Sequence, residues 1–144
     1  MDVSAYFRFL NFRGLQDYKK RCNSFFWLKQ KVNGSCPGVN IISETHCAKK
    51  NISSWWPQWS SREDNSIWSP GKTNKKGVAI LITDEFRSAH PSLKISHIKI
   101  DPNGRYIKCI MSFEYVTFRL LGVYAPNNPL ERVNFFNGLF FSPH

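Results

Sequence analysis

The sequence lacks a long apolar run. No stretch approaches the roughly 20 apolar residues that a membrane-spanning helix requires. Residues 1–11 contain Asp2 and Arg8 where a secretory signal would have an apolar core. We therefore expect an intracellular protein that has neither a signal peptide nor a transmembrane segment.

Acidic residues are also scarce. The chain has 10 Asp and Glu against 20 Lys and Arg, which leaves a formal net charge of +10. Such an excess favours a polyanionic partner, because each phosphate that is neutralised releases condensed counterions. Nucleic acid is the first candidate and an anionic membrane surface is the second. A basic surface that is merely solvated is the alternative that charge alone leaves open.

Cysteine is rare, and its spacing is not that of a metal site. Cys22, Cys36, Cys47 and Cys109 are separated by gaps of 14, 11 and 62 residues, and the sequence contains no C-x-x-C pair. This spacing excludes the common zinc motifs. Free thiols in a reducing compartment are the simpler prediction.

What the sequence does contain is a set of short apolar runs bounded by turn residues. With 42% apolar residues the chain can bury a core. The predicted strands are residues 6–11, 39–43, 77–82, 93–100, 105–113 and 116–123, and the predicted helices are residues 16–32 and a second one beginning at Pro129. The polar, tryptophan-rich segment 49–76 is predicted to be a loop. Together these elements predict a single layered α+β or α/β domain over residues 1–144, with a mixed sheet.

Two of these elements have more specific patterns. Residues 93–100 alternate in polarity and are followed by Asp-Pro-Asn-Gly, which predicts a β-hairpin with residues 105–113. In the first helix, one face is predicted to be buried and to consist of Tyr18, Cys22, Phe25, Phe26 and Lys29. Its charged residues Lys19, Lys20 and Arg21 are expected on the other side.

Polar residues follow several of the predicted strands, where functional groups gather in layered folds. Glu44 is a carboxylate at a strand end, and such oxygens suit Mg²⁺, although a solvated glutamate is the simpler alternative from spacing alone. Asn11 suits a turn cap. Tyr124 is a phenol donor that could stabilise charge on a phosphate, or could simply pack in a Tyr-Pro turn.

The order of these motifs resembles the endonuclease/exonuclease/phosphatase superfamily, and within it the apurinic-like endonuclease domain of LINE (non-LTR) retrotransposons. The resemblance covers about the whole chain, and its strength lies in the ordered set. The matching residues are Asn11, Gly14 and Leu15; Lys20, Arg21, Leu28 and Lys29; Glu44, Thr45 and His46; residues 77–81; Asp101, Gly104, Arg105, Tyr106 and Ile107; residues 124–127; and Phe135, Phe136 and Leu139.

The resemblance implies a fold, a reaction and roles for four residues. The fold is a DNase I-like β-sandwich flanked by helices, and the reaction is Mg²⁺-dependent hydrolysis of DNA phosphodiester bonds, with Mn²⁺ as a possible substitute. Glu44 is implied to be the metal ligand, Asn11 to help place it, and Tyr124 and Asn127 to contact the phosphate. Intact family members nick target DNA, are expected in the nucleus, and have a reverse transcriptase on the same longer polypeptide.

The sequence departs from the superfamily pattern in two ways. Arg13 stands where some relatives have Asp, which weakens any claim to abasic-site repair and fits the retrotransposon branch better. The sequence also contains neither the G-D-F-N segment nor the later Asp-His pair that supply the remaining catalytic groups. We therefore expect only the amino-terminal half of the domain, truncated at the carboxyl end, with about one sheet whose inner face is unpaired. Such a polypeptide would be unstable alone and catalytically inactive.

Two other functions are alternatives to the endonuclease fragment. A non-catalytic, basic nucleic-acid-binding remnant is the alternative that the net charge supports. A phosphodiesterase acting on phosphoinositides or sphingomyelin is disfavoured by the Tyr-Ala-Pro-Asn and Gly-Arg-Tyr-Ile segments and by the absence of a lipid-facing segment.

Some other residues have a weaker case. His46 is predicted to be structural, and the tryptophan cluster is expected to pack within its loop more readily than to stack on bases. The residues proposed equally as phosphate contacts or as a solvated basic loop are Lys72, Lys75, Lys76 and Arg105.

Overall fold

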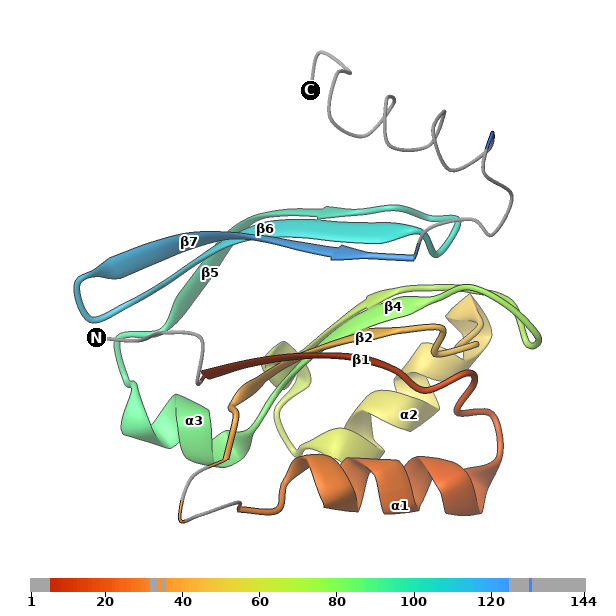
Figure 1. Cartoon of the computed structure of the whole chain (residues 1–144), viewed down its shortest axis with the longest axis horizontal. Helices are drawn as coiled ribbons and strands as arrows, with labels where there is room; N and C mark the ends of the chain where they lie inside the picture. The colour runs from red at the N-terminus through yellow and green to blue at the C-terminus, as the bar shows by residue number, and fades with distance from the viewer. Residues whose placement is uncertain (1–5, 32–33, 35, 125–129, 131–144) are drawn as a thin grey trace.

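The computed structural model describes residues 6–31, 34, 36–124 and 130, which form two β-sheets and three α-helices (Figure 1). The elements are β1 (Phe7–Asn11), α1 (Tyr18–Leu28), β2 (Val39–Ser43), η2 (Lys49–Asn51), α2 (Ile52–Trp59), η3 (Glu63–Asn65), β3 (Ser66–Ser69), β4 (Val78–Ile82), α3 (Asp84–Ala89), β5 (Lys94–Ile100), β6 (Tyr106–Phe113) and β7 (Val116–Val123). The predicted mixed α/β class is confirmed. The helix predicted from Pro129 lies outside the described residues, apart from Leu130. No helix in the described part is long and apolar enough to cross a membrane.

The first sheet has four strands in the order β1-β2-β4-β3. β1 runs parallel to β2, and the other two pairings are antiparallel. Every residue of β4 is buried, and so are four of the five residues of β2. Strands buried on both faces need cover on each side. Figure 1 shows α1 and α2 along one face of this sheet and the second sheet across the other.

The second sheet is an antiparallel meander in the order β5-β6-β7, which confirms the predicted hairpin. Along β6 the buried residues alternate, and Ile107, Met111 and Phe113 share one core cluster with Ile41 and Ile80 of the first sheet. The prediction of about one sheet with an unpaired inner face is therefore wrong. Strand periodicity shows which face is buried, but it does not show that the meander folds back to cover it.

Helix α1 confirms the predicted helix but not its predicted buried face. The helix begins after Asp17, whose side chain accepts a hydrogen bond from the Lys20 amide at 2.8 Å, as an N-cap should. Its buried residues are Arg21, Phe25 and Leu28, whereas the helix residues Tyr18 and Phe26, which were expected inside, are exposed.

Arg21 is buried, and its guanidinium has hydrogen-bond and ring partners inside the fold. Its Nη1 donates to the Leu15 carbonyl at 2.9 Å and its Nε donates to Gln58 Oε1 at 2.7 Å. The guanidinium also lies 4.3 Å from the centre of the Trp55 ring. A buried charge is tolerated when such partners replace its water, and two of them, Gln58 and Trp55, come from the distant helix α2.

The segment predicted as a loop over residues 49–76 contains α2 and β3. Polar residues and Pro57 inside α2 weaken its helical pattern. Its tryptophans pack against the first sheet: Trp55, Trp59 and Trp68 are buried in a cluster with Phe25 of α1. The packing role expected for these tryptophans is therefore confirmed for these three.

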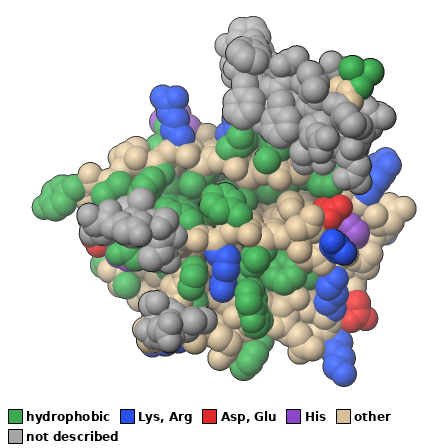
Figure 2. All heavy atoms as spheres, viewed as in Figure 1, with side chains coloured by type: hydrophobic (Ala, Val, Ile, Leu, Met, Phe, Trp, Pro, Cys, Tyr) green, Lys and Arg blue, Asp and Glu red, His purple; other side chains and the backbone are tan. Residues whose placement is uncertain are grey.

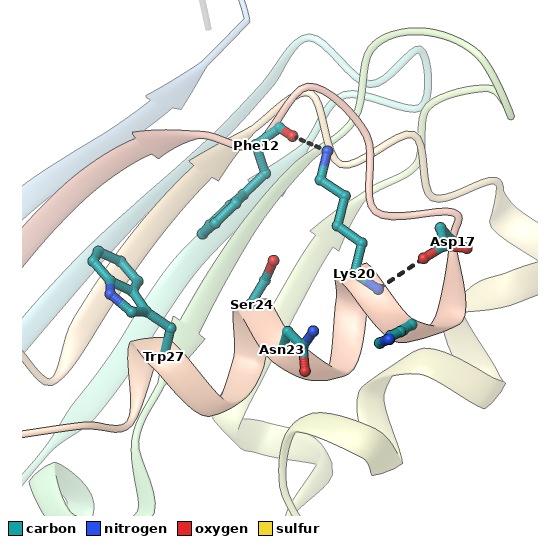
Figure 3. Close-up of a pocket in the computed structure, with 7 residues that line it drawn as sticks. Phe12, Asp17, Lys20, Asn23, Ser24 and Trp27 are labelled. Carbon is teal, nitrogen blue, oxygen red and sulfur yellow. Dashed lines mark hydrogen bonds between the residues drawn. The ribbon is translucent and has the colours of Figure 1, made fainter.

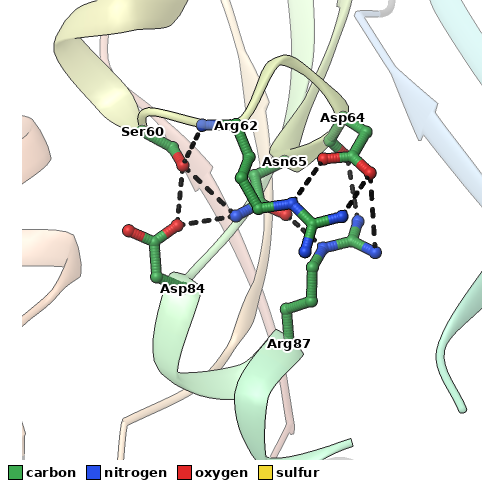
Figure 4. A network of polar contacts seen from close by, with 6 residues as sticks. All are labelled: Ser60, Arg62, Asp64, Asn65, Asp84 and Arg87. Carbon is green, nitrogen blue, oxygen red and sulfur yellow. Dashed lines mark hydrogen bonds and ion pairs between the residues drawn. The ribbon is translucent and has the colours of Figure 1, made fainter. Parts of the chain in front are cut away.

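A polar network fastens α3, which was also not predicted, to the connection between α2 and β3 (Figure 4). Fully buried Asn65 donates to Ser60 Oγ at 3.2 Å and to Asp84 Oδ1 at 2.6 Å, and it accepts from Arg87. Arg62 donates two hydrogen bonds to the Asp64 carboxylate, which lower the pKa of that acid. The five charged or amide side chains of this network therefore have structural partners. They lie at the end of the first sheet where β3 begins and β4 ends.

A substitution at Gly122 tests how closely the two sheets pack. A Cβ at this position would lie 2.8 Å from Ile41 Cγ2 and 3.1 Å from Val78 Cγ1. We expect Gly122→Ala to lower the free energy of unfolding by about 1–3 kcal/mol through overpacking, as measured by urea denaturation. Thr117→Ala, on the exposed side of β7, is the matched control and should change it by less than about 0.5 kcal/mol. Equal effects of the two substitutions would contradict the close packing.

Candidate functional site

Strand ends from both sheets meet at one end of the molecule (Figure 1). Ser43 at the end of β2 pairs with Asn11 at the end of β1 and with Val78 at the start of β4. In the second sheet, Val123 at the end of β7 pairs with Tyr106 at the start of β6. We call this end the rim, and its candidate functional side chains are those of Asn11, Glu44, Lys76, Arg105 and Tyr124.

A series of backbone hydrogen bonds joins these strand ends across the two sheets. The Thr45 amide donates to the Gly77 carbonyl at 3.1 Å, and the Gly77 amide donates to the Gly104 carbonyl at 2.9 Å. The Tyr124 amide donates to the Arg105 carbonyl at 2.7 Å. The segments that contain Glu44, Lys76, Arg105 and Tyr124 are therefore held side by side.

Asn11 caps the turn after β1 and faces the second sheet. Its Oδ1 accepts from the Arg13 amide at 2.8 Å, the turn role that the sequence predicted. Asn11 and Ser43 also line a groove of about 260 Å³ with Leu121 and Val123 of β7. The side-chain nitrogen of Asn11 makes no hydrogen bond with another described residue, so it is available to a ligand in this groove.

Glu44 is half-buried, and among the described residues no hydrogen bond or ion pair engages its carboxylate. Its negative charge acts on His46, whose pKa is lowered mainly by burial and is partly raised again by Glu44. The Nδ1 atom of His46 is buried without a hydrogen-bond partner in the described part of the chain.

The backbone of the rim is unusual. Arg13, Glu44, His46 and Lys76 all have φ between 54° and 63°, in the left-handed region that non-glycine residues rarely adopt. Only two other non-glycine residues in the described ranges have positive φ. Such conformations cost of order 1–3 kcal/mol each and cluster at functional sites. They mark the rim as a candidate site independently of its side chains.

Basic side chains gather around Lys76. Burial and then the charges of Arg105, Lys75 and Lys72 lower the pKa of Lys76, while Asp101 opposes them. Figure 2 shows basic, acidic and histidine side chains next to one another at this end of the molecule. The structure thus brings together the four basic residues that the sequence offered as phosphate contacts. Crowded cations of this kind form a favourable place for an anion.

The structure brings together most of the predicted site. Asn11, Glu44 and Tyr124 share the rim, and half-buried Tyr124 packs against the core cluster between the sheets. Asn127 lies outside the described residues. Ser43, which lines the groove, was not predicted, because nothing in the sequence distinguishes it from other serines at strand ends.

The described residues contain no group of three or more His, Cys, Asp or Glu side chains placed to hold a metal ion. Among the described residues, the rim offers the Glu44 carboxylate and the Asn11 amide, whereas the Asp101 carboxylate already accepts from the Arg105 amide at 3.0 Å. This set suits a cation such as Mg²⁺, which keeps several waters and takes one or two carboxylates from the protein. No known protein-family model matches the chain.

The pKa of His46 reports directly on its distance from Glu44. In Glu44→Gln the carboxylate charge is lost, so the imidazolium is less stable and the His46 pKa should fall further below its ordinary 6.5. An NMR titration of the histidine C2 proton measures this change. Glu63→Gln, which removes a carboxylate at the other end of the first sheet, should leave the pKa unchanged. A His46 pKa that is unchanged in Glu44→Gln would show that the two side chains are too far apart to interact.

Proposed function

We propose that the rim binds a magnesium ion and a backbone phosphate of DNA, as part of a DNA endonuclease site of the DNase I-like β-sandwich class. The observation that carries the proposal is a convergence at one end of two stacked sheets: half-buried Glu44, whose carboxylate bonds to no other described residue, the Asn11 amide nitrogen, which likewise has no partner in the described ranges, and four basic side chains. The similarity of the ordered motifs to LINE-type endonucleases supports the same reaction class.

Each rim residue has a defined task in this proposal. Glu44 holds the cation, with Mn²⁺ as a substitute for Mg²⁺; when bound, such an ion offsets charge on the phosphate and on the leaving oxygen. The Asn11 amide and the Tyr124 hydroxyl donate hydrogen bonds to phosphate oxygens. Lys76 and Arg105 hold the flanking backbone by charge, which positions the strand without selecting its sequence. Asn127 belongs to the same set by resemblance alone.

The chain as given is proposed to bind DNA without turning it over. The family resemblance assigns the activation of water to the G-D-F-N and Asp-His segments, and the sequence contains neither. A non-catalytic nucleic-acid-binding protein is the second candidate, and the net charge of +10 favours it. The two candidates differ in whether Mg²⁺ and Glu44 contribute to binding.

The first experiment measures duplex DNA binding with and without Mg²⁺ at matched ionic strength, by fluorescence anisotropy. We expect Mg²⁺ to strengthen binding roughly five-fold or more, the usual scale of coupling between two ligands. Glu44→Gln should abolish this increment because the neutral amide is a poor ligand for Mg²⁺, whereas Glu63→Gln should retain it. Equal binding with and without Mg²⁺ in the unsubstituted protein would contradict the proposed metal site. Only the non-catalytic nucleic-acid-binding function would then remain.

A plasmid-nicking assay with Mg²⁺ accompanies this measurement. Robust nicking that Glu44→Ala abolishes would show that the chain is an active endonuclease, and it would overturn the proposed inactivity.

The second experiment concerns the basic side chains. Each phosphate contact contributes about 0.9 to the slope of log K against log salt. We expect the double substitution Lys75→Gln and Lys76→Gln to reduce that slope by roughly 1–2, as measured by titrations between low and moderate salt. The control removes the same charge at the opposite end, with Lys31→Gln and Lys94→Gln, and should change the slope little. Equal changes would indicate binding by net charge alone.

A further inference from the structure

We propose that a hollow between α1 and the turn after β1 binds an unpaired nucleobase of the DNA strand whose phosphate lies at the rim. The choice of DNA as partner rests on the proposed function. The hollow has a volume of about 470 Å³, within the range of small-ligand sites. Its lining includes Phe12, Lys19, Lys20, Asn23, Ser24 and Trp27 (Figure 3).

Trp27 is an aromatic surface that is fixed in orientation yet left open. Trp27 is 52% exposed, whereas Trp55, Trp59 and Trp68 are buried. The Arg8 guanidinium lies 4.7 Å from the centre of the Trp27 ring. Arg8 is itself held, because its Nε donates to Asn40 at 2.9 Å and its Nη2 donates to the Leu28 carbonyl at 2.8 Å. A ring that is oriented in advance loses little entropy when a base stacks on it.

Phe12 forms the other aromatic wall. Its carbonyl accepts a hydrogen bond from Lys20 Nζ at 2.7 Å, which fastens the turn to α1. Figure 3 shows the rings of Phe12 and Trp27 directed toward the same hollow, with Ser24 and Asn23 on the helix between them. Phe12 directly follows Asn11, so the Phe12 end of the hollow adjoins the rim, and Trp27 lies beside Arg8, toward the other end of β1. A DNA strand that leaves the rim along β1 would bring a later nucleotide to Trp27.

Several remaining groups of the hollow match a nucleotide; Asp17 also lines it, with its carboxylate accepting the N-cap hydrogen bond from the Lys20 amide. The side chains of Asn23 and Ser24 make no hydrogen bond with other described residues, so both can serve the polar edge of a base. Lys19 is exposed and places a positive charge where a flanking phosphate would lie. Aromatic surfaces combined with basic side chains are characteristic of sites that stack unpaired bases.

The test compares the affinity of the full-length chain for a single-stranded oligodeoxynucleotide before and after Trp27→Leu, by fluorescence anisotropy. Loss of base stacking should weaken binding roughly five- to 150-fold. Phe26→Leu is the matched control, since Phe26 is an exposed aromatic residue of α1 outside the hollow, and it should leave the affinity unchanged. Trp27→Phe should retain most of the binding.

The outcomes separate this inference from the proposed function. Selective loss in Trp27→Leu, with the Mg²⁺-dependent increment through Glu44 retained, supports the base site. Selective loss without any Mg²⁺-dependent increment still supports the base site but contradicts the metal site. Unchanged affinity in Trp27→Leu, or an equal loss in Phe26→Leu, would overturn the base site.

Discussion

The two sheets meet at the rim through a backbone contact that leaves no room for side chains. A Cβ on Gly104 would lie 2.8 Å from the Gly77 nitrogen, whose amide donates to the Gly104 carbonyl. Ser69 Oγ donates to the Asp101 carbonyl in the same turn. These bonds pin the β5–β6 turn to the start of β4. Because Lys76 precedes one strand and Arg105 precedes another, the same contact sets the distance between their charges, and the arrangement of the rim depends on it.

Much of this fold could be predicted from local pattern. The run at β4 is apolar throughout and the run at β2 is mostly so, and a buried strand needs only such a run between turns. The helix α2 could not be predicted in the same way, because its stability comes from burying Trp55 and Trp59 against a sheet that the local sequence does not contain. The buried Arg21 misled the assignment of the α1 face for the same reason: its partners lie at Leu15 and Gln58.

The candidate site, like the fold, could be predicted only in part from the local sequence. The rule that polar residues at strand ends meet at one edge placed Asn11, Glu44 and Tyr124 together, and the rim agrees with it. The left-handed backbone at Glu44 and His46 could not be predicted, because non-glycine residues adopt it only when surrounding hydrogen bonds impose it. Here the Glu44 carbonyl accepts from the Gly14 amide at 2.7 Å, and the His46 amide donates to the Lys76 carbonyl at 2.9 Å.

The electrostatics of the rim give a reason why binding and folding would be coupled there. Lys76 is partly buried beside other cations, and both burial and repulsion disfavour its charged form, as the lowered pKa records. The folded state therefore bears an electrostatic cost that the unfolded chain avoids. A ligand that binds only the folded state stabilises it by mass action, and a phosphate would in addition remove part of this repulsion. A cation bound at Glu44 without the phosphate would instead repel Lys76 and further disfavour its charged form. The proposed metal and phosphate sites should for that reason be filled together more readily than either is filled alone.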